Sequence, residues 1–360
     1  MRYGSIKYIL NLLNLILACN HLLAQECMQD LIPASYPTAI YESRNGWHLP
    51  CSGTLRILVI LAEVNYDVGV DPNSNVTWQQ GTFPVWGNSM FDMSVPLTGL
   101  FTQYFHLASS GNFFVQGDYL QPSSNGGVIT VNESDIIAFG YQNALVAAIN
   151  NQMTTGFVTR SGITNPAFFD LWTPSLFGMA KLNSSNSSFD HVMIMWRNHN
   201  IATGTGNATT LNLGTILGYN SDSWSQFGAQ VNMPLDIARH EFSHLIIGGN
   251  NFHVSGGSEA NMWIGKNSAH AMLSLTSAAL NCWSAWDRHR LNWIAPGNQY
   301  SISARDETNS MEVSGDLDAS VSSHSGTYTL RDFTVTGDAI RIKLPFTPGN
   351  KYQEYIWLEN

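Results

Sequence analysis

The side chains best suited to chemistry lie in the run His240-Glu241-Phe242-Ser243-His244. On a helix, residues four positions apart share a face, so His240 and His244 can present two imidazole nitrogens to one metal ion. Zinc is commonly held by histidine in this way. Glu241 stands beside the pair, where its carboxylate can take a proton from a water that the metal activates. The spacing therefore predicts a zinc site with Glu241 as the general base.

The residues around this run predict a short, buried helix. Residues 232–236 include a proline that suits a helix entry, and the segment from Phe242 to Ile247 is mostly apolar. Gly248 and Gly249 then favour a helix end. A solvated surface helix is the alternative, and the apolar residues count against it. A buried helix that stops at glycines lets the chain turn back toward the metal with a third ligand.

The composition favours a soluble, secreted protein and argues against nucleic-acid binding. Only 12% of the 360 residues are charged, and the formal net charge is −10. The 16 lysines and arginines form no run, whereas a surface that binds phosphates needs clustered basic side chains. A polar, mildly acidic surface keeps such a chain in solution.

The first residues have the pattern of a secretory signal peptide. Two basic residues precede a largely apolar stretch at 8–18, and Ala24 is a small residue suited to cleavage. The stretch is too short to span a membrane, and no later segment approaches twenty apolar residues, so no transmembrane helix is expected. Residues 16–19 also resemble a bacterial lipoprotein box, so a lipid anchor at Cys19 on the cell surface is the alternative to free secretion.

Cysteine usage fits an oxidising compartment. If Cys19 leaves with the signal peptide, Cys27, Cys51 and Cys282 remain. Cys27 and Cys51 flank a short segment and are the expected disulfide, which leaves Cys282 as a buried thiol. The alternative is that one of the early cysteines reaches the zinc as a latency device, although 25–50 is short for a pro-region.

Hydrophobic periodicity predicts an α/β structure before residue 298. Strands are expected at 55–64, 113–119 and 190–196, and helices at 97–107 and 135–153. The long apolar run of the first strand indicates burial on both faces. This order fits an α/β half-domain that lays its active helix beneath a mixed sheet. From 298 onward, short β-favouring segments alternate with turn residues, which predicts a β-rich module.

Two more segments accompany the histidine run and its preceding arginine. They are Tyr-Phe-His-Leu-Ala-Ser-Ser-Gly-Asn-Phe-Phe-Val-Gln-Gly-Asp at 104–118 and Ser-Ala-Trp-Asp-Arg-His-Arg-Leu-Asn-Trp at 284–293. In this order the three segments resemble the immune-inhibitor-A-like secreted metallopeptidases, over roughly residues 53–360. The resemblance implies a zincin-type (α+β) catalytic domain with one catalytic zinc, endopeptidase activity on proteins, calcium sites and β-rich C-terminal modules.

The expected third ligand departs from the wider metzincin-like pattern. There a glycine follows the second histidine by three residues and a ligand by six, but Ile247 and Asn250 occupy those places here. His253, nine residues after His244, is therefore the expected third ligand, delivered by a wider loop. Glu259 is the next candidate, followed by a carboxylate or histidine further on, such as Asp287 or His289.

Two further features stay open at this stage. Met272 is placed to be the methionine that floors the zinc in metzincins, or it is an ordinary core residue. Asp67, Asp71 and Asn73 carry oxygen atoms of the kind that calcium binds, but without the spacing of an EF-hand, and a solvated turn is the alternative.

The resulting domain expectations are a signal peptide at 1–24, an N-terminal segment at 25–52, the zincin-like catalytic domain at 53–297 and the β-rich module at 298–360. Because the last residues read as the middle of a strand, we expect the natural chain to continue beyond them.

The predicted function is that of a secreted zinc-dependent endopeptidase acting on a protein or peptide substrate. One alternative keeps the zinc chemistry but acts on another amide or on a glycoprotein. The other is a non-catalytic surface-binding protein that retains the zincin scaffold. No serine-hydrolase elbow or phosphate-binding loop occurs in the sequence, so those chemistries are not expected.

Overall fold

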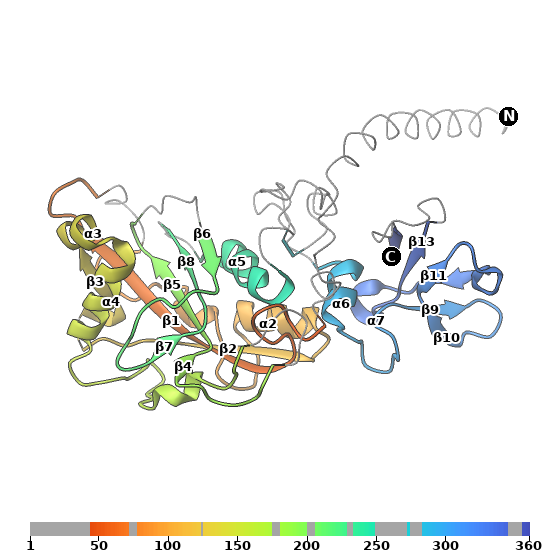
Figure 1. Cartoon of the computed structure of the whole chain (residues 1–360), viewed down its shortest axis with the longest axis horizontal. Coiled ribbons are helices and arrows are strands. Elements are labelled where there is room, and N and C mark those ends of the chain that lie inside the picture. Colours follow the sequence, from red (N-terminus) through yellow and green to blue (C-terminus); the bar gives the residue numbers. More distant parts are fainter. Residues whose placement is uncertain are drawn as a thin grey trace.

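The protein is a mixed α/β structure whose largest element is a six-stranded mixed sheet (Figure 1). It is seen in a computed structural model. The structure describes residues 44–71, 78–123, 125–174, 181–199, 206–228, 233–248, 272–273, 283–344 and 355–360.

Strand β1 (Gly53–Asn65) is the centre of this sheet. A parallel strand that is covered on both faces needs an unbroken apolar run, and residues 57–62 are at most 1% exposed. On one side β1 pairs in parallel with β2 (Phe113–Tyr119) and, further along, with β3 (Ile129–Asn132). On the other side it pairs in parallel with β5 (His191–Trp196). The three strands predicted in this region are confirmed.

The two strands beyond β5 give the sheet both parallel and antiparallel pairs. Strand β8 (Trp224–Phe227) pairs in parallel with β5, and β6 (Gly206–Thr209) pairs antiparallel with β8. The predicted mixed sheet is thus confirmed. A separate two-stranded ladder joins β4 (Ser188–Phe189) to β7 (Asn220–Ser221).

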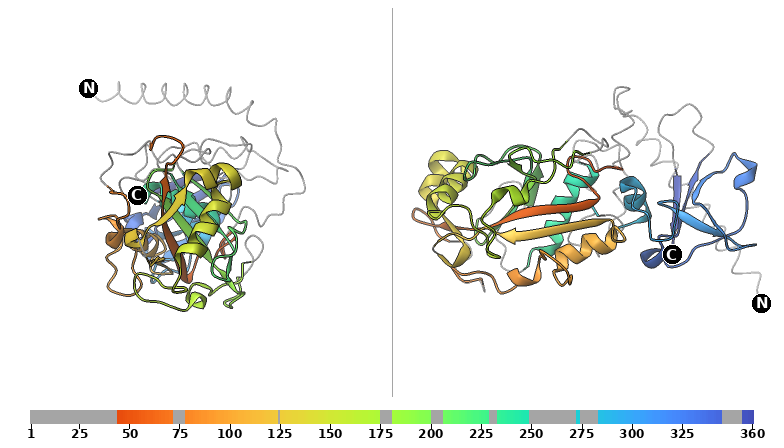
Figure 2. Two further views of the ribbon diagram at one scale, coloured as in Figure 1. Left: turned by 90° about the vertical axis from the view of Figure 1, so that its left-hand side faces the viewer. Right: turned by 90° about the horizontal axis from the view of Figure 1, so that it is seen from below.

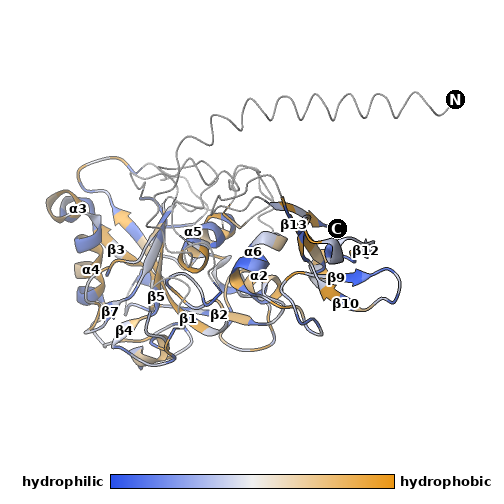
Figure 3. Ribbon diagram, turned by 45° about the vertical axis from the view of Figure 1, so that its right-hand side comes forward, coloured by the Kyte–Doolittle hydropathy of each residue, from blue (hydrophilic) through white to orange (hydrophobic). Residues whose placement is uncertain are grey.

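Helices cover both faces of the sheet (Figure 2). Helices α2 (Leu100–Ala108) and α5 (Leu235–Ile247) lie on one face, and α4 (Tyr141–Gln152) lies on the other. Successive side chains of a strand point to opposite faces, so Val59 packs in the core under α5 while its neighbour Leu58 packs in the core under α4. Apolar residues accordingly lie both in strands of the sheet and on the helices that pack against it (Figure 3).

The single helix predicted at 135–153 is wrong, because the chain forms two helices there. Helix α3 (Glu133–Phe139) ends at Gly140, and α4 begins immediately after it. Gly140 has φ 77° and ψ 151°, a conformation that favours glycine and breaks the helical hydrogen-bond ladder. The helix predicted at 97–107 is confirmed as α2.

Residues after 283 form short helices and two small sheets at the opposite end of the molecule from α3 (Figure 1). The helices are α6 (Ala285–Leu291) and α7 (Phe333–Thr336). One sheet contains β10 (Glu312–Ser314), β9 (Ser303–Asp306) and β12 (Tyr328–Thr329), and the other contains β11 (Asp316–Asp318), β13 (Ala339–Lys343) and β14 (Tyr355–Glu359). No helix within the described ranges is long and apolar enough to cross a membrane.

A buried histidine connects the sheet to α5. His191 on β5 is fully buried, and its Nδ1 and Nε2 atoms each lie 2.9 Å from a serine hydroxyl, that of Ser223 and Ser225 respectively. Its ring packs edge-on against Phe242 of α5, with ring centroids 5.5 Å apart. Burial lowers the pKa of His191 to about 3. The imidazole under α5 is therefore neutral.

This burial predicts a pH-dependent stability. The unfolded chain protonates His191 near pH 6.5, whereas the folded protein resists protonation down to about pH 3. The unfolded state therefore binds more protons below pH 6.5, so this contribution is complete above that pH and is lost as the pH falls. Between pH 7 and 5 we expect it to lower the free energy of unfolding by about 2 kcal/mol. Urea denaturation of wild type and His191→Asn at both pH values measures this, and equal pH slopes in the two proteins would contradict it.

Candidate metal centre on helix α5

The helix predicted through the histidine run is present as α5, and it ends at Gly248. Pro234 occupies the N-cap position, and its carbonyl accepts the Ala238 N–H at 2.9 Å. At the other end Gly248 has φ 149°, a backbone conformation that favours glycine. Gly249 lies outside the described residues. Residues 240–247 are all buried, which the apolar residues around the histidines predicted.

The structure brings His240 and His244 together. Their ring centroids lie 5.0 Å apart with an interplanar angle of 82°, and the residues are 3% and 7% exposed. Nδ1 of His244 lies 3.2 Å from the carbonyl oxygen of Gly248. With its proton on Nδ1 donated to this carbonyl, the ring keeps its lone pair on Nε2, the atom that would bind a metal. His244 is therefore oriented as a metal-binding imidazole would be, beside the ring of His240.

The side chain of Glu241, on α5, lies against Gly206 of β6. The residue is 8% exposed, and within the described part of the chain its carboxylate accepts no hydrogen bond. Burial raises the pKa of Glu241 to about 7. A nearby cation would lower that pKa again. A carboxyl group that titrates near neutrality can take up and return a proton.

The carbonyl end of α5 is held by residues from distant parts of the chain. A buried helix end needs donors for its last carbonyls, because water cannot reach them. Three of the pairs are Trp47 N–H to Ile246 O (2.8 Å), His48 N–H to Leu245 O (2.9 Å) and Arg290 Nε–H to Ile247 O (3.0 Å). The segment before β1 and helix α6 thus fix the end of α5 that carries His244.

The segment before β1 is itself anchored. Lys181 Nζ donates to the carbonyls of Gly46 and Trp47 at 3.0 and 3.1 Å. The Cys51 thiol is buried, 3.4 Å from the carbonyl oxygen of Arg44, and burial raises its pKa to about 12. Its expected disulfide partner Cys27 lies outside the described residues, so that pairing stays a prediction.

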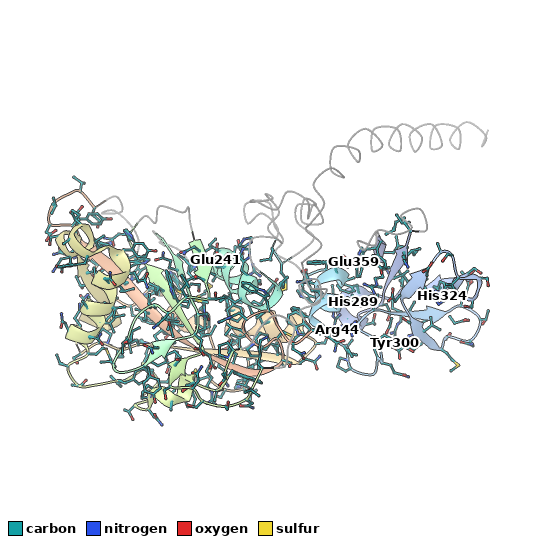
Figure 4. The ribbon with its side chains drawn as sticks, viewed as in Figure 1. Arg44, Glu241, His289, Tyr300, His324 and Glu359 are labelled. Atoms are coloured by element: carbon teal, nitrogen blue, oxygen red, sulfur yellow. The ribbon has the colours of Figure 1, made fainter. Side chains whose placement is uncertain are left out.

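The two preferred candidates for a third ligand cannot be placed beside the histidines from the described residues. His253 and Glu259 both lie outside them, and no group of three His, Cys, Asp or Glu within the described ranges is arranged to hold a metal. Of the later candidates, His289 has its Nδ1 atom 2.9 Å from Ser301 Oγ. Its ring lies 5.8 Å from that of Trp357 on β14. Figure 4 shows His289 on α6, well away from Glu241.

Asp287 is used at the start of α6 rather than beside the two histidines. Its Oδ2 accepts the backbone N–H groups of Ser284 at 2.8 Å and of Met272 at 3.0 Å, and Ser284 and Asp287 form a capping box. Met272 is 1% exposed and packs in the same core cluster as Phe242 of α5. Asp287 therefore ties the backbone of Met272, a residue of that core, to the start of α6. The Ser-x-x-Asp spacing is a helix-capping signal visible in the sequence, and it predicts this role for Asp287 better than that of a metal ligand.

The residues considered for calcium bind separate partners. Asp67 accepts from the backbone N–H and the hydroxyl of Ser134 at the start of α3. Asp71 accepts from Arg197 and Asn198. Asn73 lies outside the described residues. Among the described residues, Asp67 and Asp71 are thus each bound by side chains or backbone of a different segment.

Known proteins add no further support. No model of a known protein family matches the sequence, and no curated protein matches it. The resemblance to immune-inhibitor-A-like metallopeptidases therefore rests on the residues of the three segments alone.

The contact between Arg290 and Ile247 predicts a stability effect. Arg290 is 3% exposed, and its Nε and Nη2 atoms donate to Ile247 O at 3.0 and 2.9 Å. Arg290→Met fills similar space but leaves this carbonyl without the two donors, so we expect a loss of about 1–3 kcal/mol in the free energy of unfolding. Arg290→Lys keeps a donor and should lose less. Urea denaturation gives both values, and a methionine variant as stable as wild type would contradict the role.

Proposed function

We propose that this protein is a secreted zinc-dependent endopeptidase. The observation that carries the proposal is the pair of adjacent, buried imidazoles of His240 and His244, with Glu241 between them in sequence and Nδ1 of His244 bonded to Gly248. His253 is the proposed third ligand, with Glu259 as the next candidate. Two histidines with an oriented outer partner, next to a buried carboxylate, suit hydrolysis by an activated water.

In the proposed reaction, the metal and Glu241 have separate roles. Zinc, when bound, would acidify a water and polarise the substrate carbonyl. The Glu241 carboxylate takes the proton from the attacking water and then returns it to the nitrogen of the leaving amine. The low exposure of Glu241 and of both histidines excludes bulk water from around these groups, which strengthens their electrostatic interactions.

The edge of the sheet next to Glu241 supports a peptide substrate. Strand β6 pairs with β8 along one side, and no described strand pairs with its other side. An extended peptide can add to such an edge through main-chain hydrogen bonds. Since Gly206 of β6 lies against Glu241, a peptide bound there would pass close to the proposed general base. Within the described residues, no comparable feature favours another amide or a glycoprotein.

The proposed domain boundaries are those predicted from the sequence. Residues 53–297 would form a zincin-type catalytic domain, for which α5 packed against a mixed sheet is the supporting feature. Residues 298–360 would form a β-rich module, supported by the two small sheets found there. A signal peptide at 1–24 would direct secretion, with a lipid anchor at Cys19 as the alternative location. Calcium sites are proposed from the resemblance only.

The general base can be tested with Glu241→Gln. The substitution preserves side-chain size but removes the proton acceptor, so we expect zinc content to stay unchanged while kcat on a casein-type substrate falls on the order of 10²- to 10⁴-fold. Glu307→Gln on the surface is the matched control and should behave as wild type. Full activity in Glu241→Gln contradicts the mechanism. Chelator-insensitive binding of proteins by a wild type that cleaves none of them favours the non-catalytic alternative.

The third ligand can be tested by metal analysis. A structural or catalytic zinc needs at least three protein ligands, so His253→Ala should bind well under the roughly one zinc per chain expected of wild type. Glu259→Ala should leave the metal content unchanged. If the two results are exchanged, Glu259 is the ligand, and if both variants keep full zinc the ligand lies elsewhere.

A further inference from the structure

Strand β6 passes directly over Glu241 with two small residues facing α5. Side chains alternate along a strand, and Ala208 packs on the core cluster that contains Phe242 of α5. Gly206, two residues earlier, shares that direction, because a Cβ atom built on it would point at Ile237 and Glu241 of α5. The helix therefore approaches this strand through a side that carries no large side chain.

The space above Gly206 is occupied by Glu241 itself. A Cβ atom at this position would lie 2.8 Å from Ile237 Cγ1, 3.0 Å from Glu241 Cγ and 3.1 Å from Glu241 Oε1. Carbon atoms in ordinary contact are separated by about 3.5–4.0 Å, so one of these groups would have to move. Gly206 is not among the residues with positive φ, so its backbone does not require glycine. Limited space, not backbone conformation, is therefore what favours glycine here.

The Glu241 side chain is the group that would give way most easily. The backbone of α5 is held by its packing against Phe101, Phe105 and Phe113 and by the donors to its last carbonyls. Ile237 is partly buried against the same core. The Glu241 carboxylate, by contrast, accepts no hydrogen bond within the described residues that would hold it in place.

We infer that Gly206 is a positioning residue for Glu241: the absent side chain lets the carboxylate keep its place between α5 and β6. The inference rests on the proposed function for its catalytic consequence. Misplacing a reacting group by about 1 Å is enough to lower a rate on the order of 100-fold. A methyl group at position 206 should therefore damage proton transfer while leaving the histidines untouched.

The first test measures kcat and KM separately for each variant. Gly206→Ala should lower kcat about 10- to 100-fold, with zinc content unchanged and KM altered much less. Adding Ile237→Ala should restore part of kcat, because it frees space on the other side of the new methyl group. Gly326→Ala is the matched control, since its φ is not positive and its nearest neighbour would lie 3.5 Å away. Wild-type kcat in Gly206→Ala, alongside an inactive Glu241→Gln, overturns the inference and leaves the proposed function standing.

A stability cycle tests the same contact without any catalysis. Gly206→Ala should lower the melting temperature by a few degrees, and the loss should shrink when Glu241 is also replaced by alanine, because residues in contact give non-additive effects. Fully additive shifts overturn the inference. If wild type proves to have no hydrolytic activity at all, the proposed function fails, and a non-additive cycle still places Gly206 as the residue that leaves room for Glu241.

Discussion

The buried carbonyl end of α5 is the constraint on which the rest of the site depends. A helix that ends inside a protein leaves its last carbonyls without water, and each one left unpaired costs about 1–3 kcal/mol. Here Trp47 and His48 supply backbone donors from one side, and Arg290 supplies its guanidinium from the other. These partners lie more than forty residues away along the chain. The helix can carry His244 only where three separate segments meet.

Aromatic packing then fixes how α5 is rotated against the sheet. Phe242 contacts the rings of Phe101, Phe105 and Phe113, with centroids 5.6, 5.0 and 6.4 Å away. Because residues that follow each other on a helix are turned by about 100°, a Phe242 that points at α2 and the sheet directs Glu241 to another side, against β6. The neutral ring of His191 completes this contact from the sheet. The packing of Phe242 in the core thus also determines where the proposed base, Glu241, is placed.

Local sequence patterns predicted the central strands and helix α5. Most of the features that these patterns did not predict depend on contacts between residues far apart in the chain. The strands at β1, β2 and β5 and the ends of α5 follow from apolar runs and a glycine stop, which are properties of short windows of sequence. The break at Gly140 did not follow from the pattern, because glycine is tolerated within helices and only its positive φ shows the interruption. The roles of Arg290 and Gly206 could not be predicted either, since each depends on a partner far away in the chain.

Gly248 illustrates how one residue serves both the fold and the candidate site. Its N–H donates to the carbonyl of His244 at 3.1 Å, which closes the last turn of the helix. Its own carbonyl lies 3.2 Å from Nδ1 of the same histidine. The backbone angles of Gly248 that stop the helix, φ 149° and ψ 161°, therefore also set the direction of this carbonyl. A glycine recognisable in the sequence as a helix stop thus also supplies the carbonyl beside Nδ1 of His244, the place of an outer partner if His244 binds the proposed zinc, so the end of α5 and the orientation of His244 are set together.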